Sequence, residues 1–171
     1  MPHYYSINTK MKIYLAGPDV FRQNAKEHFE KLNSFLSLKG HKALIPLDNQ
    51  IDPTKAELVC EQIFNGNIQM IEMADIVVAN IDPFRGACMD DGTAFEIGMA
   101  FARKKKIYAY CTEPECTIPE TTKKMFDISK QAEYSEIEDF GHCVNFMIHY
   151  AIIQSGGKIY RTFEECIEAL G

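Results

Sequence analysis

Two carboxyl groups, Asp90 and Glu96, stand six residues apart in the segment DDGTAFEIG. The pattern predicts that Glu96 lies in the first turn of a helix, where the helix dipole favours an ionised carboxylate, as a nucleophile requires. Asp90 precedes that helix in a polar loop, where it could be held protonated. Two carboxyl groups in different environments are what acid and nucleophile roles require. The segment therefore indicates an active site.

A structural role for Glu96 stands beside the catalytic one. The run Thr93-Ala94-Phe95-Glu96 matches a capping box, in which the threonine caps the helix and the glutamate binds the amide of the cap. Capping boxes are a common signature of helix N-termini. The residues of this segment alone leave both roles open.

A strand and a helix must position these carboxyl groups. The apolar run at 76–79 predicts a buried parallel strand, which ends where Pro83 forces a turn. A loop with four charged residues follows, namely Asp82, Arg85, Asp90 and Asp91. The chain then enters a helix whose apolar positions, Phe95, Met99 and Ala102, recur at helical spacing. The charged loop thus lies outside the carboxyl end of a strand, where ligands bind in open α/β sheets.

The chain before and after this segment alternates between strand and helix patterns. The predicted strands are 12–16, 41–47 and 107–110, and the predicted helices are 24–39 and 53–73, the second in one piece or in two divided near Gly66. Together with the central strand these elements give a βαβαβαβ order. That order predicts an α/β fold, a parallel sheet with helices on both faces.

The C-terminal third is less regular. Residues 111–138 predict a long loop with one helical turn at most, and such loops often form lids or subunit contacts. Residues 140–154 predict a helix that is apolar on several sides, which favours burial against another chain. The end of the chain predicts a short strand near 158–160 and a last helix capped by Thr162 and Glu165.

Composition limits the possible partners. The 171 residues are 46% hydrophobic, which predicts a single domain over 11–171. The first ten residues predict a flexible tail. The net charge of −6 argues against binding to nucleic acid or to an anionic membrane. Six scattered cysteines and the lack of a signal-peptide pattern or long apolar span predict a cytoplasmic protein.

Few other residues suggest chemistry. Tyr14 lies near the end of the first strand, on the sheet edge expected for Glu96, so its phenol could orient a carboxylate. The histidines lack ligand spacing, and no Gly-rich phosphate-binding motif is present. We therefore predict no metal and no cofactor.

Four segments together resemble the nucleoside 2-deoxyribosyltransferase family: KIYLAGPDVF, PLDNQ, DPFRGACMDDGTAFEIGMA and VNFM. The resemblance covers most of residues 12–147. It implies a flavodoxin-like fold and exchange of the nucleobase of 2′-deoxyribonucleosides in nucleoside salvage. The exchange would be a retaining double displacement through a deoxyribosyl-glutamate intermediate.

The resemblance also implies roles for single residues. Glu96 would be the nucleophile, Tyr14 would orient it, and Asp90 would handle the proton on the base. The substrate-binding residues would be Phe21, Gln50, Asn67, Asn145 and Met147. The last two resemble residues lent to a neighbouring subunit, which implies a homo-oligomer, a dimer or a hexamer, with shared active sites.

One position departs from some relatives. Asn67 stands where some members of the family carry an aspartate that helps to recognise the base, so base preference stays open. Two alternatives remain at this stage. The chain could be an N-glycoside hydrolase of nucleosides or deoxynucleotides with the same fold, or a non-catalytic nucleoside-binding domain.

Overall fold

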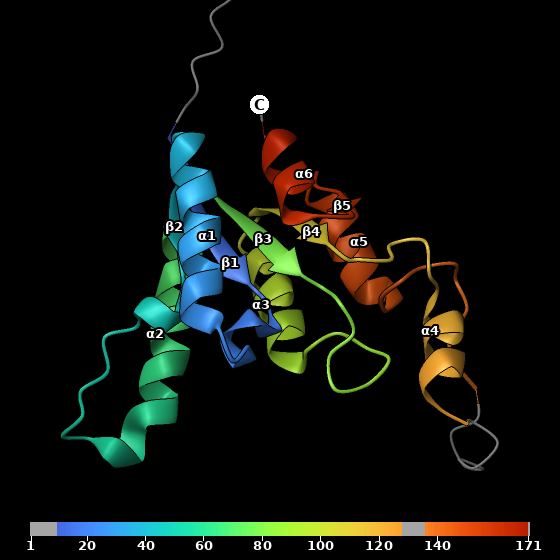
Figure 1. The fold of residues 1–171 in the computed structure, drawn as a ribbon, viewed down its shortest axis with the longest axis horizontal. Helices are drawn as coiled ribbons and strands as arrows, with labels where there is room; N and C mark the ends of the chain where they lie inside the picture. Colours follow the sequence, from blue (N-terminus) through green and yellow to red (C-terminus); the bar gives the residue numbers. More distant parts are fainter. Residues whose placement is uncertain (1–9, 128–135, 171) are drawn as a thin grey trace, which may run out of the picture.

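The computed structural model describes residues 10–127 and 136–170. These residues form a parallel β-sheet that helices cover on both faces (Figure 1). The five strands run in the order β2-β1-β3-β4-β5, and every neighbouring pair is parallel. The predicted α/β fold is confirmed. The predicted tail at 1–10 lies, apart from Lys10, outside the described residues.

The strands are short, and the middle of the sheet is fully buried. They are β1 (Lys12–Ala16), β2 (Lys42–Leu44), β3 (Ile76–Asn80), β4 (Lys106–Tyr110) and β5 (Ile159–Tyr160). All five residues of β3 are buried, because helices cover both of its faces. Side chains alternate along each strand, so neighbouring residues of β1 enter different cores.

The two cores lie on opposite faces of the sheet. Tyr14 and Ala16 of β1 pack in the core that receives side chains from α2 (Val59–Met73), α3 (Asp91–Ala102) and α5 (Phe146–Gln154). Ile13 and Leu15 enter the core formed with α1 (Ala25–Leu38) and α6 (Phe163–Glu168). Tyr14 therefore points towards the layer of helices that contains Glu96.

Several predicted boundaries are wrong. The second strand ends at Leu44, because Pro46 begins a 3-10 turn, η2 (Pro46–Asp48). The helix expected from residue 53 begins at Val59, after η3 (Ala56–Leu58). It continues through Gly66 without a break. A further 3-10 turn, η1 (Pro18–Phe21), follows β1.

The start of α3 differs from the predicted capping box. Asp90 is the N-cap, and its side chain accepts a hydrogen bond from the Thr93 amide. Thr93 is buried three residues inside the helix, and Glu96 lies in the second turn. The buried positions of α3 are Thr93, Ile97 and Ala100, whereas Phe95 is 55% exposed. Glu96 is therefore not a cap residue.

The irregular C-terminal region contains more helix than predicted before residue 126 and less after residue 139. Here α4 (Ile118–Met125) spans two turns, and Thr117 and Glu120 form the capping box at its start. The last long helix, α5, begins only at Phe146. Figure 1 shows α4 at the opposite end of the molecule from α1 and α2. Within residues 10–127 and 136–170, no helix has the length and apolar character needed to cross a membrane.

Candidate active site

Glu96 and Tyr14 meet beside the C-terminal half of β1. The Tyr14 hydroxyl donates a hydrogen bond of 2.5 Å to Glu96 Oε1. The Tyr14 side chain is fully buried, so its ring cannot swing away from the carboxylate. The pairing joins residues 82 positions apart in sequence. The expected contact between these two side chains is confirmed.

The burial of Glu96 changes its ionisation. Burial raises the pKa of Glu96 to about 7, the Tyr14 hydrogen bond lowers it, and the charge of Asp90 raises it further. The expected stabilisation by the helix dipole is wrong, because that effect is confined to the first turn and Glu96 lies in the second. Burial and the Glu96 carboxylate also raise the pKa of Tyr14 above its ordinary value, so the phenol remains a donor.

Asp90 is held by the start of α3. Its Oδ2 accepts hydrogen bonds of 2.9 Å from both the amide and the hydroxyl of Thr93. Asp90 is thus a fixed cap residue and not part of a flexible loop, which corrects the prediction. Both bonds use the same oxygen, and no residue within 10–127 and 136–170 donates to Oδ1, so that oxygen is available to a ligand. Asp90 and Glu96 line one cavity, as two cooperating carboxyl groups must.

That cavity has a volume of about 510 Å³, within the range of small-molecule sites. Its polar lining comes from Asn49, Asn67, Asp90, Thr93 and Glu96. Its apolar lining comes from Val20, Phe21, Pro46, Leu47, Ile51 and Ile63. The combination of a largely apolar lining and a few polar groups suits a flat aromatic ligand with a polar substituent.

A buried ionic network fixes η1, which forms one wall of the cavity. Asp19 is 4% exposed and accepts hydrogen bonds from Arg22 Nε at 2.5 Å, Asn80 Nδ2 at 2.9 Å and Tyr110 Oη at 3.2 Å. A buried carboxylate is stable only with such partners. Because Asn80 and Tyr110 end β3 and β4, the network ties η1 to the sheet. No sequence pattern predicted this role of Asp19.

Phe21 extends from η1 over the cavity and is 59% exposed. Its ring stacks on Phe84, with centroids 5.4 Å apart. The guanidinium carbon of Arg85 lies 5.0 Å from the Phe21 centroid and 4.6 Å from the Phe84 centroid. An exposed aromatic ring supported in this way can stack on a planar ligand.

Asn67 and Asn49 form another part of the cavity lining. Asn67 Nδ2 lies 3.5 Å from Glu96 Oε1, and Asn67 Oδ1 accepts a hydrogen bond of 2.8 Å from Asn49 Nδ2. The family resemblance implied Gln50 from this segment, whereas Asn49 lines the cavity. The Gln50 amide instead donates to the carbonyl of Asp48, and its side chain is exposed outside the cavity lining. Neighbouring positions in an irregular loop point in different directions, so only the fold could distinguish them.

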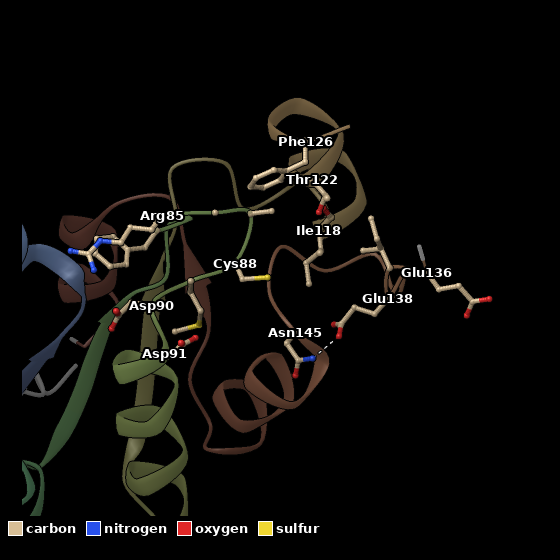
Figure 2. Close-up of a pocket in the computed structure, with 15 residues that line it drawn as sticks. Arg85, Cys88, Asp90, Asp91, Ile118, Thr122, Phe126, Glu136, Glu138 and Asn145 are labelled. Carbon is tan, nitrogen blue, oxygen red and sulfur yellow. Dashed lines mark hydrogen bonds between the residues drawn. The ribbon is translucent and has the colours of Figure 1, made fainter. Parts of the chain in front are cut away.

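A larger cavity of about 700 Å³ is lined by residues 84–91, by residues of α4 and by residues 136–138 (Figure 2). Asp90 lines both cavities but Glu96 lines only the smaller one, so we place the site in the smaller cavity. Asn145 lines the larger one, donates to Glu138 Oε2 at 2.5 Å and caps α5. Met147 is 66% exposed.

Within this chain neither Asn145 nor Met147 lines the cavity of Glu96. The expectation that these two residues complete a neighbour's site stays a prediction.

Two other acidic residues of the loop do not line that cavity. Asp82 binds the amide and hydroxyl of Thr112, at 2.6 and 3.0 Å, and so connects the loops after β3 and β4. Asp91 is the first residue of α3 and lines the larger cavity. Of the four charged residues predicted near the ligand, only Asp90 lies beside Glu96 in the smaller cavity.

Comparison with known families gives one match over most of the chain. The family described as nucleoside 2-deoxyribosyltransferase matches residues 13–147. This range contains every residue that lines the smaller cavity. A curated relative, an uncharacterized protein of Schizosaccharomyces pombe, is 32% identical over 105 residues. That alignment covers 59% of this chain and 50% of the relative, so the chain spans about half the length of the relative.

Solved structures give the same fold. A 2-deoxyribosyltransferase from Leishmania mexicana superposes with a TM-score of 0.73 at 28% identity, covering 94% of this chain and 96% of that chain. A CMP N-glycosidase from Clostridium botulinum superposes with a TM-score of 0.53 at 20% identity, covering 93% and 97%. The second likeness is in fold alone.

Proposed function

Since the chain belongs to the nucleoside 2-deoxyribosyltransferase family, we propose that it exchanges the nucleobase of 2′-deoxyribonucleosides through a deoxyribosyl-Glu96 intermediate. The observation that carries the proposal is a cavity lined by both Asp90 and Glu96, in which Glu96 accepts a hydrogen bond from the buried Tyr14 behind it. The exchange would serve nucleoside salvage.

In the proposed first step, the Glu96 carboxylate attacks the anomeric carbon and the bond from that carbon to the base nitrogen breaks. Both hydrogen bonds that the described residues make to Glu96 reach Oε1, so Oε2 is the attacking oxygen. The electron pair of the broken bond goes to the base nitrogen, which takes a proton carried by Asp90 Oδ1; the incoming base returns a proton to the same oxygen when it attacks. An incoming base then attacks the same carbon and releases Glu96, so that two inversions retain configuration.

The raised pKa of Glu96 fits this role. A carboxylate in a poorly solvated site is more reactive than one in water, while a pKa of about 7 still leaves it half ionised at neutral pH. The Tyr14 hydrogen bond favours the ionised form. We therefore expect kcat/KM to rise with pH through about 7, as Glu96 of the free enzyme ionises.

Product analysis tests the proposal. The protein is incubated with deoxyinosine or thymidine, with and without adenine or cytosine, and products are separated by chromatography. We expect a new deoxynucleoside only when an acceptor base is present. Release of free base at one rate with or without acceptor, and no new nucleoside, would mean that the protein is a hydrolase.

Trapping tests the nucleophile directly. A slow 2-fluoro-substituted deoxynucleoside is mixed with the protein, quenched in acid and analysed by mass spectrometry. We expect an added sugar mass on the peptide that contains Glu96, and none in Glu96→Ala. An adduct on Asp90 or Asp91 would contradict the assignment.

A further inference from the structure

We infer that Asn49 and Asn67 form an amide relay that orients the Glu96 carboxylate and stabilises its negative charge, with Gly66 providing the space for it. Asn67 is thus a positioning residue for the nucleophile. The kinetic part of this inference rests on the proposed function, but the geometric part does not.

The orientation of the relay follows from one backbone carbonyl. Asn49 Nδ2 lies 2.8 Å from the Pro46 oxygen, which can only accept a hydrogen bond. The amide of Asn49 must therefore present its NH₂ group on this side. The second hydrogen of that group points to Asn67 Oδ1, also at 2.8 Å. Both donors of Asn49 are then occupied.

The same logic fixes Asn67. Because its Oδ1 accepts from Asn49, its Nδ2 must face the other way, towards Glu96 Oε1 at 3.5 Å. This distance is at the outer limit of a hydrogen bond, so the amide acts mainly as an oriented dipole with its positive end towards the carboxylate. A nucleobase that replaced either contact would break this arrangement. We therefore assign Asn67 to Glu96.

Gly66 explains why the relay fits against α2. A Cβ atom at Gly66 would lie 1.8 Å from Asn49 Oδ1 and 2.7 Å from Asn49 Cγ. The Asn49 amide thus rests directly on the backbone of α2. Glycine is unfavourable inside a helix, and this close approach is the reason for it here.

The Asn67 side chain is neutral and therefore does not oppose the ionisation of Glu96. The titratable groups that face Glu96 from the packed elements are Tyr14 on β1 and Asp90 at the start of α3. The helix α2 contributes the neutral Asn67. An aspartate at this position would place a second negative charge against Glu96 and oppose its ionisation.

Titration of Glu96 in the substrate-free protein tests the relay. Carbon-13 NMR of labelled glutamate side chains follows its carboxyl, which Glu96→Gln identifies by loss of one signal. We expect Asn67→Ala and Asn49→Ala each to raise the Glu96 pKa, although Asn49 does not touch Glu96. Asn67→Asp should raise it further, by about 1 to 3 pH units. Gly66→Ala should behave as Asn49→Ala does.

Asn65→Ala is the matched control, since Asn65 is an exposed asparagine of the same helix. It should leave the titration of Glu96 as in the wild type. The relay is refuted if Asn67→Ala and Asn49→Ala titrate as the control does. Should Asn67→Ala fail to fold by circular dichroism, Asn67→Ser makes the same test.

Kinetics separates the relay from the proposed function. In the relay variants we expect kcat to fall and the rise of kcat/KM with pH to move upward, with the ranking of acceptor bases unchanged. If the ranking of acceptor bases changes while the pH dependence of kcat/KM does not, Asn67 recognises the base and does not position Glu96. Lack of exchange in the wild type would refute the proposed function, and the NMR titration would still decide the relay.

Discussion

Replacing Glu96 by glutamine should stabilise the protein at alkaline pH and inactivate it. The folded state raises the pKa of Glu96 from an ordinary 4.5 to about 7, mainly by burial. At about 1.4 kcal/mol per pH unit, the ionised carboxylate costs about 3 kcal/mol of folding free energy. Glutamine has no charge to bury, and its side-chain oxygen can still accept from Tyr14.

The direction of the pH dependence follows from proton binding. Between pH 4.5 and about 7 the folded state holds the Glu96 proton more tightly than the unfolded state. The contribution of this group to stability is therefore full below pH 4.5 and is lost as pH rises through about 7. The wild type should lose this stability with rising pH, whereas Glu96→Gln should not.

Urea denaturation at about pH 4 and about pH 9 measures the effect. The free energy of unfolding of Glu96→Gln should be close to that of wild type at the lower pH and about 3 kcal/mol above it at the higher pH. For a domain of this size that gain corresponds to about 6 to 12 °C in Tm. Glu30→Gln, which removes an exposed carboxylate of α1, is the matched control.

Two outcomes would refute the reasoning. The free energies of unfolding of Glu96→Gln and Glu30→Gln could differ from that of wild type by the same amount at both pH values. In that case, burial of the Glu96 carboxylate does not destabilise the folded protein. If Glu96→Gln keeps base exchange, Glu96 is not the nucleophile, because a neutral amide cannot form the glycosyl-enzyme. We expect instead that the ionised Glu96 carboxylate lowers the folding stability of the protein and is required for its activity.

Three further substitutions test the other site residues. Tyr14→Phe should slow exchange by about tenfold or more and shift the rise of kcat/KM to higher pH, because the hydrogen bond that lowers the Glu96 pKa is lost; an unshifted pH profile would contradict this. Asp90→Ser keeps a good helix cap, so urea denaturation should show a change within about 0.5 kcal/mol, while exchange falls by about 100-fold. Normal turnover in Asp90→Ser would mean that Asp90 serves only as the helix cap. Inactive Asn145→Ala and Glu96→Ala proteins, when mixed, should recover activity if subunits share sites, and no recovery would mean that Asn145 serves only its own chain.

The alternation of strands and helices was readable from local pattern. Buried strands such as 76–79 are continuous apolar runs, and the order of elements leaves a parallel sheet as the one compact arrangement. Residue types and spacing also selected Asp90 and Glu96, since the chemistry requires two carboxyl groups. The family followed from the same segments and is confirmed by the match over residues 13–147.

The tertiary structure decided how those residues are held. The start of α3 depended on which side chain turns its oxygen towards a free amide: the sequence pattern predicted Thr93, and in the structure Asp90 is the cap. The choice of Asn49 over Gln50 depended on a 3-10 turn and on the space left by Gly66. The ionisation of Glu96 is set by Tyr14 and by burial between elements far apart in the chain, because desolvation depends on neighbours in space and not on neighbours in sequence.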